Sequence, residues 1–264
     1  MKIRIILLLL LGQALAAQVQ MPTLSGRPID WQADRFLGRD KFGYLYLIRD
    51  REFVKVLGAQ QAGFQKPELG RISRADILNP LLPMLFYRDF NTVVMLDSQL
   101  NEVRSVNFTE LQQKGLTIVA EAAGIASMNR LWIYDGLARQ LGLFDYNRNV
   151  FTPVGNPQQK NIIAYTTDYN RFTWIDEDRK MYSSDVFGKT ASVGGVPEFE
   201  AVIFLSEQEI IYRKGDALTY LNVSSGAEKS LPVVDKSFDA FFYGDQNLSI
   251  FTKQAISNYK ITLP

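Results

Sequence analysis

Residues 85–97 read LFYRDFNTVVMLD, and this stretch decides the fold. An apolar run from Leu85 to Tyr87 ends in a polar turn, and a second apolar run continues from Thr92 to Leu96. Both runs are nearly continuous rather than alternating, which is typical of strands whose sheet is covered on both faces. The stretch therefore predicts two neighbouring strands of a sheet packed between two further layers.

The same strand–turn–strand unit recurs along the chain at intervals of about 40 residues. The turns that anchor the six units are Phe42-Gly43, Phe90-Asn91, Asn129-Arg130, Asn170-Arg171, Gln208-Glu209 and Gln246-Asn247. The corresponding blade cores are expected at 36–56, 82–108, 123–150, 162–187, 201–225 and 239–262. A repeat of this length built only from strands is typical of a β-propeller. We predict an all-β fold, a six-bladed β-propeller with three to four antiparallel strands in each blade.

The sequence leaves some alternatives to this arrangement. A two-sheet sandwich would leave one face of each sheet exposed to solvent, and its strands would alternate more strictly between apolar and polar residues. It is therefore disfavoured. Blade counts of five or seven stay open, because unit boundaries depend on the choice of turns. The short stretch Ile29-Asp30-Trp31 is expected to pair with the last blade and close the ring. In the segment 109–123, Gly115 and the β-branched run 117–119 favour a strand over a helix.

The first 16 residues have the features of a secretory signal peptide. Lys2 and Arg4 precede an apolar run from Ile5 to Leu11, and the small residues of Ala14-Leu15-Ala16 suit signal peptidase. The run is about half the length needed to cross a bilayer as a helix. The alternative is a buried N-terminal strand. We expect residues 1–16 to be removed and residues 17–264 to form one exported propeller domain without a transmembrane helix.

The composition excludes several classes of function. The chain contains no cysteine and no histidine, so disulfides, cysteine lipidation, Ser-His-Asp triads and His-ligated metals are excluded. Loss of Lys2 and Arg4 with the signal takes the basic residues from 29 to 27 against 28 acidic ones, a net charge of −1. This near-neutral balance, without a dense Lys/Arg cluster, argues against nucleic acid and against an anionic membrane surface as partners.

Carboxylates are the main catalytic groups that remain. A glycoside hydrolase would need two of them facing a cleft. Six aspartates lie near predicted strand ends: Asp40, Asp89, Asp135, Asp168, Asp185 and Asp245. Because they recur at equivalent turns, we interpret them as groups that hydrogen-bond the local backbone. The acidic run 176–178 is the best calcium candidate, but it lacks the spacing of a calcium loop and is expected to be a solvated β-turn. We predict no catalytic residue, no metal site and no cofactor.

Aromatic residues supply the remaining interaction signal. Tyr87, Arg88, Asp89 and Phe90 combine aromatic and charged groups of the kind found in protein-recognition hot spots. The alternative is that these aromatic rings fill the wedge between blades. We take these four residues as the predicted binding residues of a chain that is itself monomeric.

Residues 79–97, together with the motif DKFGYLY at 40–46, resemble an uncharacterised family of exported β-propellers from the Bacteroidetes cell envelope. The resemblance extends over the first two units by residue and over the others by spacing only. It implies a periplasmic or outer-membrane-associated propeller and brings no catalytic residue with it.

These observations together predict a non-enzymatic protein-interaction module of the periplasm or outer membrane. Its expected partner is another envelope protein, and one role is that of an accessory subunit in an outer-membrane assembly or secretion machine. The alternative is a carboxylate-dependent, glycan-active enzyme or a small-ligand sensor that uses the propeller channel.

Overall fold

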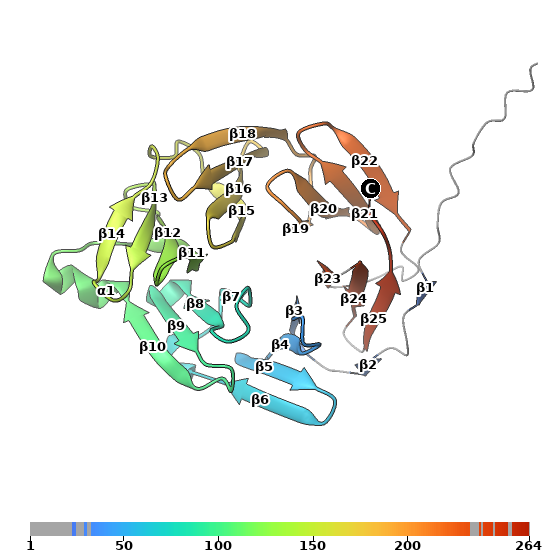
Figure 1. Cartoon of the computed structure of the whole chain (residues 1–264), viewed down its shortest axis with the longest axis horizontal. Helices are drawn as coiled ribbons and strands as arrows, with labels where there is room; N and C mark the ends of the chain where they lie inside the picture. The colour runs from blue at the N-terminus through green and yellow to red at the C-terminus, as the bar shows by residue number, and fades with distance from the viewer. Residues whose placement is uncertain are drawn as a thin grey trace, which may run out of the picture.

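The computed structural model describes residues 23–24, 29–30, 33–232, 238, 240–244, 246–252 and 255–263. In these residues six antiparallel sheets stand around a central axis, one after another in chain order (Figure 1). The fold is a six-bladed β-propeller, which confirms the fold predicted from the repeat. No helix in the described ranges is long and apolar enough to cross a membrane.

Blades 1 to 3 each have four strands. Blade 1 contains β3 (Arg35–Arg39), β4 (Leu45–Arg49), β5 (Glu52–Leu57) and β6 (Gln60–Phe64). Blade 2 contains β7 (Arg74–Asp76), β8 (Met84–Tyr87), β9 (Thr92–Leu96) and β10 (Glu102–Asn107). Blade 3 contains β11 (Ala120–Ala126), β12 (Arg130–Asp135), β13 (Gln140–Asp145) and β14 (Val150–Pro153).

Blades 4 and 5 repeat this plan, and blade 6 departs from it. Blade 4 contains β15 (Ile162–Thr167), β16 (Arg171–Asp176), β17 (Lys180–Asp185) and β18 (Thr190–Gly195). Blade 5 contains β19 (Ala201–Phe204), β20 (Glu209–Lys214), β21 (Ala217–Asn222) and β22 (Ala227–Leu231). Blade 6 joins β23 (Ala240–Gly244), β24 (Asn247–Phe251) and β25 (Ala255–Lys260) to β1 (Thr23–Leu24) and β2 (Ile29–Asp30).

The first strand of each blade lies nearest the axis. β11 lies against β7 and β15, and β23 lies against β19 and β3, so these strands surround the central axis (Figure 1). Because strands within a blade alternate in direction, all innermost strands run the same way along the axis. We call the side on which they begin the start face and the side on which they finish the end face. The turn between the first and second strands of every blade therefore lies on the end face.

The ring is closed by the N-terminal strands. Both β1 and β2 pair antiparallel with β25, with Ile29 opposite Ile256 and Thr23 opposite Lys260. This confirms that Ile29-Asp30 completes the last blade, while Trp31 lies outside the described residues. The pairing covers the backbone edge that β25 would otherwise present to other chains.

The core consists of apolar wedges between neighbouring blades. Every residue of β9 is buried, which is the double cover that its continuous apolar run predicts. Between blades 3 and 4, Trp132 and Phe172 pack edge-to-face with ring centroids 6.1 Å apart. Between blades 1 and 6, Phe36 stacks on Phe251 at 5.9 Å.

One local prediction is wrong. Between blades 2 and 3 the chain forms the short helix α1 (Phe108–Leu111) and the 3-10 turn η3 (Gln112–Lys114), where a strand was expected. The side-chain Oδ1 of Asn107 caps the helix by accepting hydrogen bonds from the Thr109 and Glu110 amides, and Phe108 and Leu111 are buried beneath it. Tertiary packing and this cap outweigh the strand preference of the β-branched residues 117–119. The next strand begins only at Ala120.

Candidate binding sites

A cavity of about 730 Å³ lies on the start face, between the beginnings of the innermost strands. Its two sides differ in chemistry. Arginines from blades 1 and 2 line one side, and apolar residues of β15 and β19 line the other, among them Ile163, Val202 and Phe204. A concave site that combines apolar walls with a few convergent polar groups is the usual form of a ligand site.

Four arginines line the described part of this cavity: Arg35, Arg71, Arg74 and Arg88. Arg35 opens β3, and its Nη2 donates to the Ile72 carbonyl at 3.4 Å. Arg74 opens β7, and its Nη1 donates to the Tyr165 carbonyl at 3.1 Å while its guanidinium lies 4.3 Å from the centre of the Tyr165 ring. The Nε atoms of Arg35 and Arg74 are buried without a hydrogen-bond partner.

The guanidinium groups are close enough to affect one another. Burial lowers the pKa of Arg35, and the positive charges of Arg74 and Arg71 lower it further. Within the described ranges, none of the four arginines has a carboxylate oxygen within 4.0 Å. The cavity therefore holds cationic groups that no protein anion neutralises directly.

Two carboxylates share the cavity with these arginines. Asp89 and Glu121 both line it and are exposed. The Glu121 carboxyl group lies against Gly136 of the turn between β12 and β13, in the space that a side chain at Gly136 would need. Counting side-chain charges, the lining has four positive groups and two negative ones, an excess of two positive charges.

The predicted binding residues divide between core and cavity. Arg88 and Asp89 line the cavity, and Phe90 is exposed at its edge beside Gly70. Tyr87 instead packs in the core between blades 1 and 2, where burial raises the pKa of its phenol and its hydroxyl finds no partner. Binding by any of the four stays a prediction.

The other three arginines of the cavity were not among the predicted binding residues. Arg35, Arg71 and Arg74 meet only because consecutive blades bring the starts of their innermost strands around one axis. The residue type could have indicated the site, because an arginine opens β3 and β7, whereas an alanine or isoleucine opens the innermost strand of each of the other blades.

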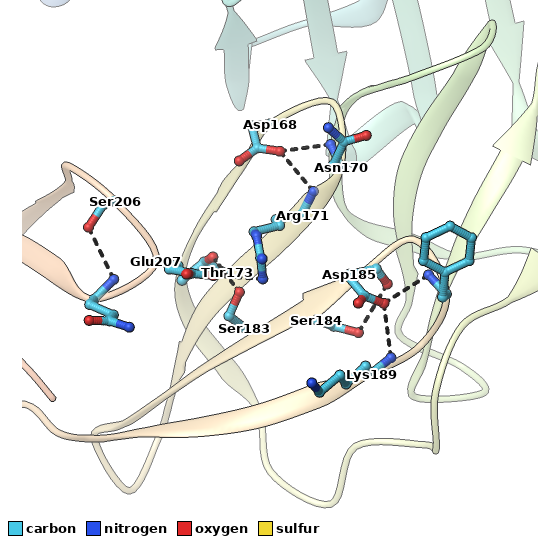
Figure 2. A network of polar contacts seen from close by, with 12 residues as sticks. Asp168, Asn170, Arg171, Thr173, Ser183, Ser184, Asp185, Lys189, Ser206 and Glu207 are labelled. Carbon is cyan, nitrogen blue, oxygen red and sulfur yellow. Dashed lines mark hydrogen bonds and ion pairs between the residues drawn. The ribbon is translucent and has the colours of Figure 1, made fainter.

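Four of the six turn aspartates hydrogen-bond backbone amides of their turns, as predicted, whereas Asp89 lines the cavity instead. Figure 2 shows Asp168 accepting from the Asn170 and Arg171 amides, and Asp185 accepting from the Phe187 and Lys189 amides. Asp40 accepts from the Phe42 and Tyr44 amides, and Asp135 from the Val119 and Leu137 amides. Asp245 lies outside the described residues.

The acidic run 176–178 enters a β-turn, as predicted, but Asp176 is the last residue of β16 and is buried rather than solvated. The Arg179 amide donates to the Asp176 carbonyl at 2.9 Å, and the Asp176 side chain accepts from the Lys180 amide. Lys160 forms an ion pair with Asp178 at 3.1 Å. In the part of the chain that the structure covers, no three acidic groups are placed to hold a metal ion together.

A second hollow, of about 340 Å³, lies between blades 4 and 5. Arg171 and Glu207 form an ion pair across it at 2.6 Å, and the Thr173 and Ser183 hydroxyls are hydrogen-bonded at 3.2 Å (Figure 2). These two pairs of polar groups satisfy one another, and the ion pair joins blades 4 and 5.

The end face carries large apolar side chains in the turns between first and second strands. Five of those described, from four consecutive blades, are 40–81% exposed: Phe42, Leu78, Leu81, Met128 and Tyr169. We call this set the apolar arc. The Ser127 amide donates to the Tyr169 carbonyl at 2.8 Å, which joins the turns of blades 3 and 4 directly. In blades 1 to 5, the turns between second and third strands expose only Phe90 and Leu137.

Comparison with known proteins identifies the class of protein. No protein-family model matches the chain. No curated protein matches it in sequence. Among solved structures, a catalytically inactive histidine-to-alanine variant of virginiamycin B lyase from Staphylococcus aureus, with quinupristin, has a TM-score of 0.57 at 9% identity, covering 91% of this chain and all of that one.

Two further structures share the fold. YCF48 from Cyanidioschyzon merolae has a TM-score of 0.52 at 10% identity, covering 83% of this chain and 79% of that one. The extracellular domain of the one component system BT4673 from B. thetaiotaomicron has a TM-score of 0.52 at 10% identity, covering 90% of this chain and 40% of that one. At this identity the likeness is one of fold, and the chain, which contains no histidine, is a β-propeller without a family assignment.

Proposed function

We propose that this chain is an exported, non-enzymatic interaction module of the cell envelope that docks another envelope protein on its end face. The propeller supplies a rigid disc whose loops are free to vary, and binding function is commonly carried by such loops. The basic, apolar and small-residue segments of residues 1–16 support export. The fold shared with an extracellular domain is compatible with that location.

The observation that carries the proposal is the apolar arc. Monomeric soluble proteins rarely gather large apolar side chains on one face unless that face binds something. At both ends of the arc the turn is fixed by an aspartate. Asp40 accepts from the Phe42 amide at 2.9 Å and from the Tyr46 hydroxyl at 2.9 Å, and Asp168 accepts from the Asn170 amide at 2.7 Å. Fixed turns lower the entropy lost on binding.

The chemistry of the arc favours a protein partner with apolar contact residues. The carboxylates of Asp40 and Asp168 are occupied by their own turns, and the Lys41 ammonium lies 5.3 Å from the centre of the Phe42 ring. An apolar centre with a polar rim is the usual composition of a protein interface. A role as accessory subunit of an outer-membrane assembly or secretion machine is one form of this function.

The alternative enzyme has one observation in its favour, because Asp89 and Glu121 line the same cavity. A glycosidase of the carboxylate class needs one carboxyl group that keeps its proton near neutral pH. Both carboxylates of this cavity are instead exposed, and four arginines line it with them. We therefore rank the interaction module above the enzyme.

Affinity purification of the tagged, full-length protein from detergent-solubilised envelope of its own organism tests the proposal. We expect a specific partner that is recovered by the parent protein and lost with the double variant Phe42→Ser/Met128→Ser. The matched control, Val103→Ser/Val150→Ser, removes two similarly exposed apolar residues from the outer strands β10 and β14 and should retain the partner. Absence of a partner above background, or equal recovery by the arc variant, would refute the proposal.

A further inference from the structure

The arginine-lined cavity is on the face opposite the apolar arc, so it can be assessed independently of the proposed function. Three chain segments bring its arginines together: the start of β3, the segment 71–74 and the turn after β8. Arg35 and Arg74 are half-buried, whereas Arg71 and Arg88 are exposed. Here the Nε atoms of Arg35 and Arg74 are buried without an acceptor, which is costly for a charged donor.

The charges indicate what kind of anion would relieve that cost. The lining has an excess of two positive charges, which a dianion would neutralise. Each guanidinium presents several donors in a fixed plane, and a phosphoryl group offers three terminal oxygens where a carboxylate offers two. Several guanidinium groups around one space are therefore better matched by a phosphate than by a carboxylate.

The opposite wall indicates what the phosphate is attached to. Ile163 is 49% exposed although it lies on an innermost strand, and Val202 and Phe204 of the next blade are half-buried. These side chains line the same cavity as the arginines and offer apolar contact to the remainder of a ligand. Tyr165 lies between the two sides and supports the Arg74 guanidinium on its ring.

We propose that the central cavity binds a phosphate monoester, with the phosphoryl group held by Arg35, Arg71, Arg74 and Arg88 and an apolar body against Ile163, Val202 and Phe204. Such a group occurs on soluble metabolites and on the headgroups of some lipids, and the recognition chemistry is the same for both.

Isothermal titration calorimetry of the full mature chain tests the site with three probes: inorganic phosphate, phenyl phosphate and benzoate. We expect phenyl phosphate to bind tightest, inorganic phosphate more weakly and benzoate weakest. Arg71→Ala and Arg88→Ala, which change exposed side chains, should each weaken phenyl phosphate about tenfold or more. Ile163→Ser should weaken phenyl phosphate but leave inorganic phosphate unchanged. Arg148→Ala, at an exposed arginine outside the cavity, is the matched control and should change neither.

Flotation with vesicles containing phosphatidic acid identifies the source of the phosphate. Recruitment that is lost in Arg88→Ala and competed by phenyl phosphate assigns a lipid headgroup, and binding of phenyl phosphate without recruitment assigns a soluble ester. The proposal is overturned if phenyl phosphate does not bind, if the Arg71→Ala and Arg88→Ala variants bind it as the parent does while showing the parent's circular dichroism, or if benzoate binds as tightly as phenyl phosphate.

Discussion

Asp76 joins three blades through one buried carboxylate, and replacing it with asparagine should destabilise the ring. It is the last residue of β7, in blade 2. Its Oδ1 accepts from the Leu78 amide at 3.0 Å. Its Oδ2 accepts from the Ile125 amide of blade 3 at 2.9 Å and from the Thr167 hydroxyl of blade 4 at 3.2 Å. Both oxygens therefore face a backbone N–H group.

This geometry sets the magnitude for Asp76→Asn. Whichever way the asparagine amide is turned, its NH₂ group must face a backbone N–H group that now lacks an acceptor. Leaving a buried donor unpaired and losing hydrogen bonds to a charged acceptor together cost about 2–4 kcal/mol. We expect the free energy of unfolding to fall by that amount.

Urea unfolding followed by tryptophan fluorescence measures the loss. Trp132 and Trp174 are buried in blades 3 and 4, the two blades that the Asp76 carboxylate holds. The matched control is Asp168→Asn, because a single oxygen of Asp168 accepts from both turn amides and an asparagine keeps that oxygen. It should change stability by less than about 0.5 kcal/mol. If Asp76→Asn unfolds at the same urea concentration as the parent, or loses no more than the control, the carboxylate does not hold the three blades.

Three further predictions concern packing, ring closure and pH. Gly124→Ala should lower the free energy of unfolding by about 1–3 kcal/mol in the same urea assay, because its Cβ would occupy the space of the Thr167 side chain, whereas Gly195→Ala, with open space around it, should be neutral. Deleting residues 17–32 removes β1 and β2, so the exposed edge of β25 should lower the melting temperature and produce oligomers in size-exclusion chromatography; a stable monomer would contradict this. Burial raises the pKa of Tyr87, with Glu102 and Glu68 adding to the effect. The folded state thus favours the neutral Tyr87 phenol, and the resulting stability is complete below the ordinary tyrosine pKa of about 10 and is lost as pH rises above it. The urea midpoint should therefore fall between about pH 10 and 11.5 in the parent, and it should fall less in Tyr87→Phe.

The central strands of the blades could be predicted from sequence, whereas several edge strands could not. The run 92–96 is apolar throughout and buried throughout, so its residues alone indicate a doubly covered strand. The expected core of blade 1, 36–56, lacks β6, because Gln60–Phe64 is largely exposed and has no apolar run. The expected core of blade 2, 82–108, lacks β7, whose residues Arg74–Asp76 form a strand only by pairing with β8.

In the candidate sites, too, only the features that are local in the sequence could be predicted. Arg88 and Asp89 were predicted from an aromatic–charged cluster that is local in the sequence, and both line the cavity. Arg35 and Ile163 lie on the same cavity although 128 positions separate them, and only the closed ring brings them together. Asp40, Asp168 and Asp185 were interpreted correctly, because the hydrogen bonds to their turn amides span two to four residues and need no tertiary contact, whereas Asp89 lines the cavity instead.

The shared sheet of blade 6 has a consequence for how the chain reaches its final shape. Its strands β1 and β2 are synthesised before blade 1 and β25 after all the other blades, so they can pair only once the whole propeller has been made. Pairings between such distant segments are slow to form, because the intervening chain must first be ordered. A nascent chain that ends before β25 has five complete sheets, and its N-terminal strands β1 and β2 have no partner. Translation that stops before β25 thus yields an open ring with unpaired strand edges at both ends. A premature stop codon near position 250 should therefore be as damaging as one far upstream.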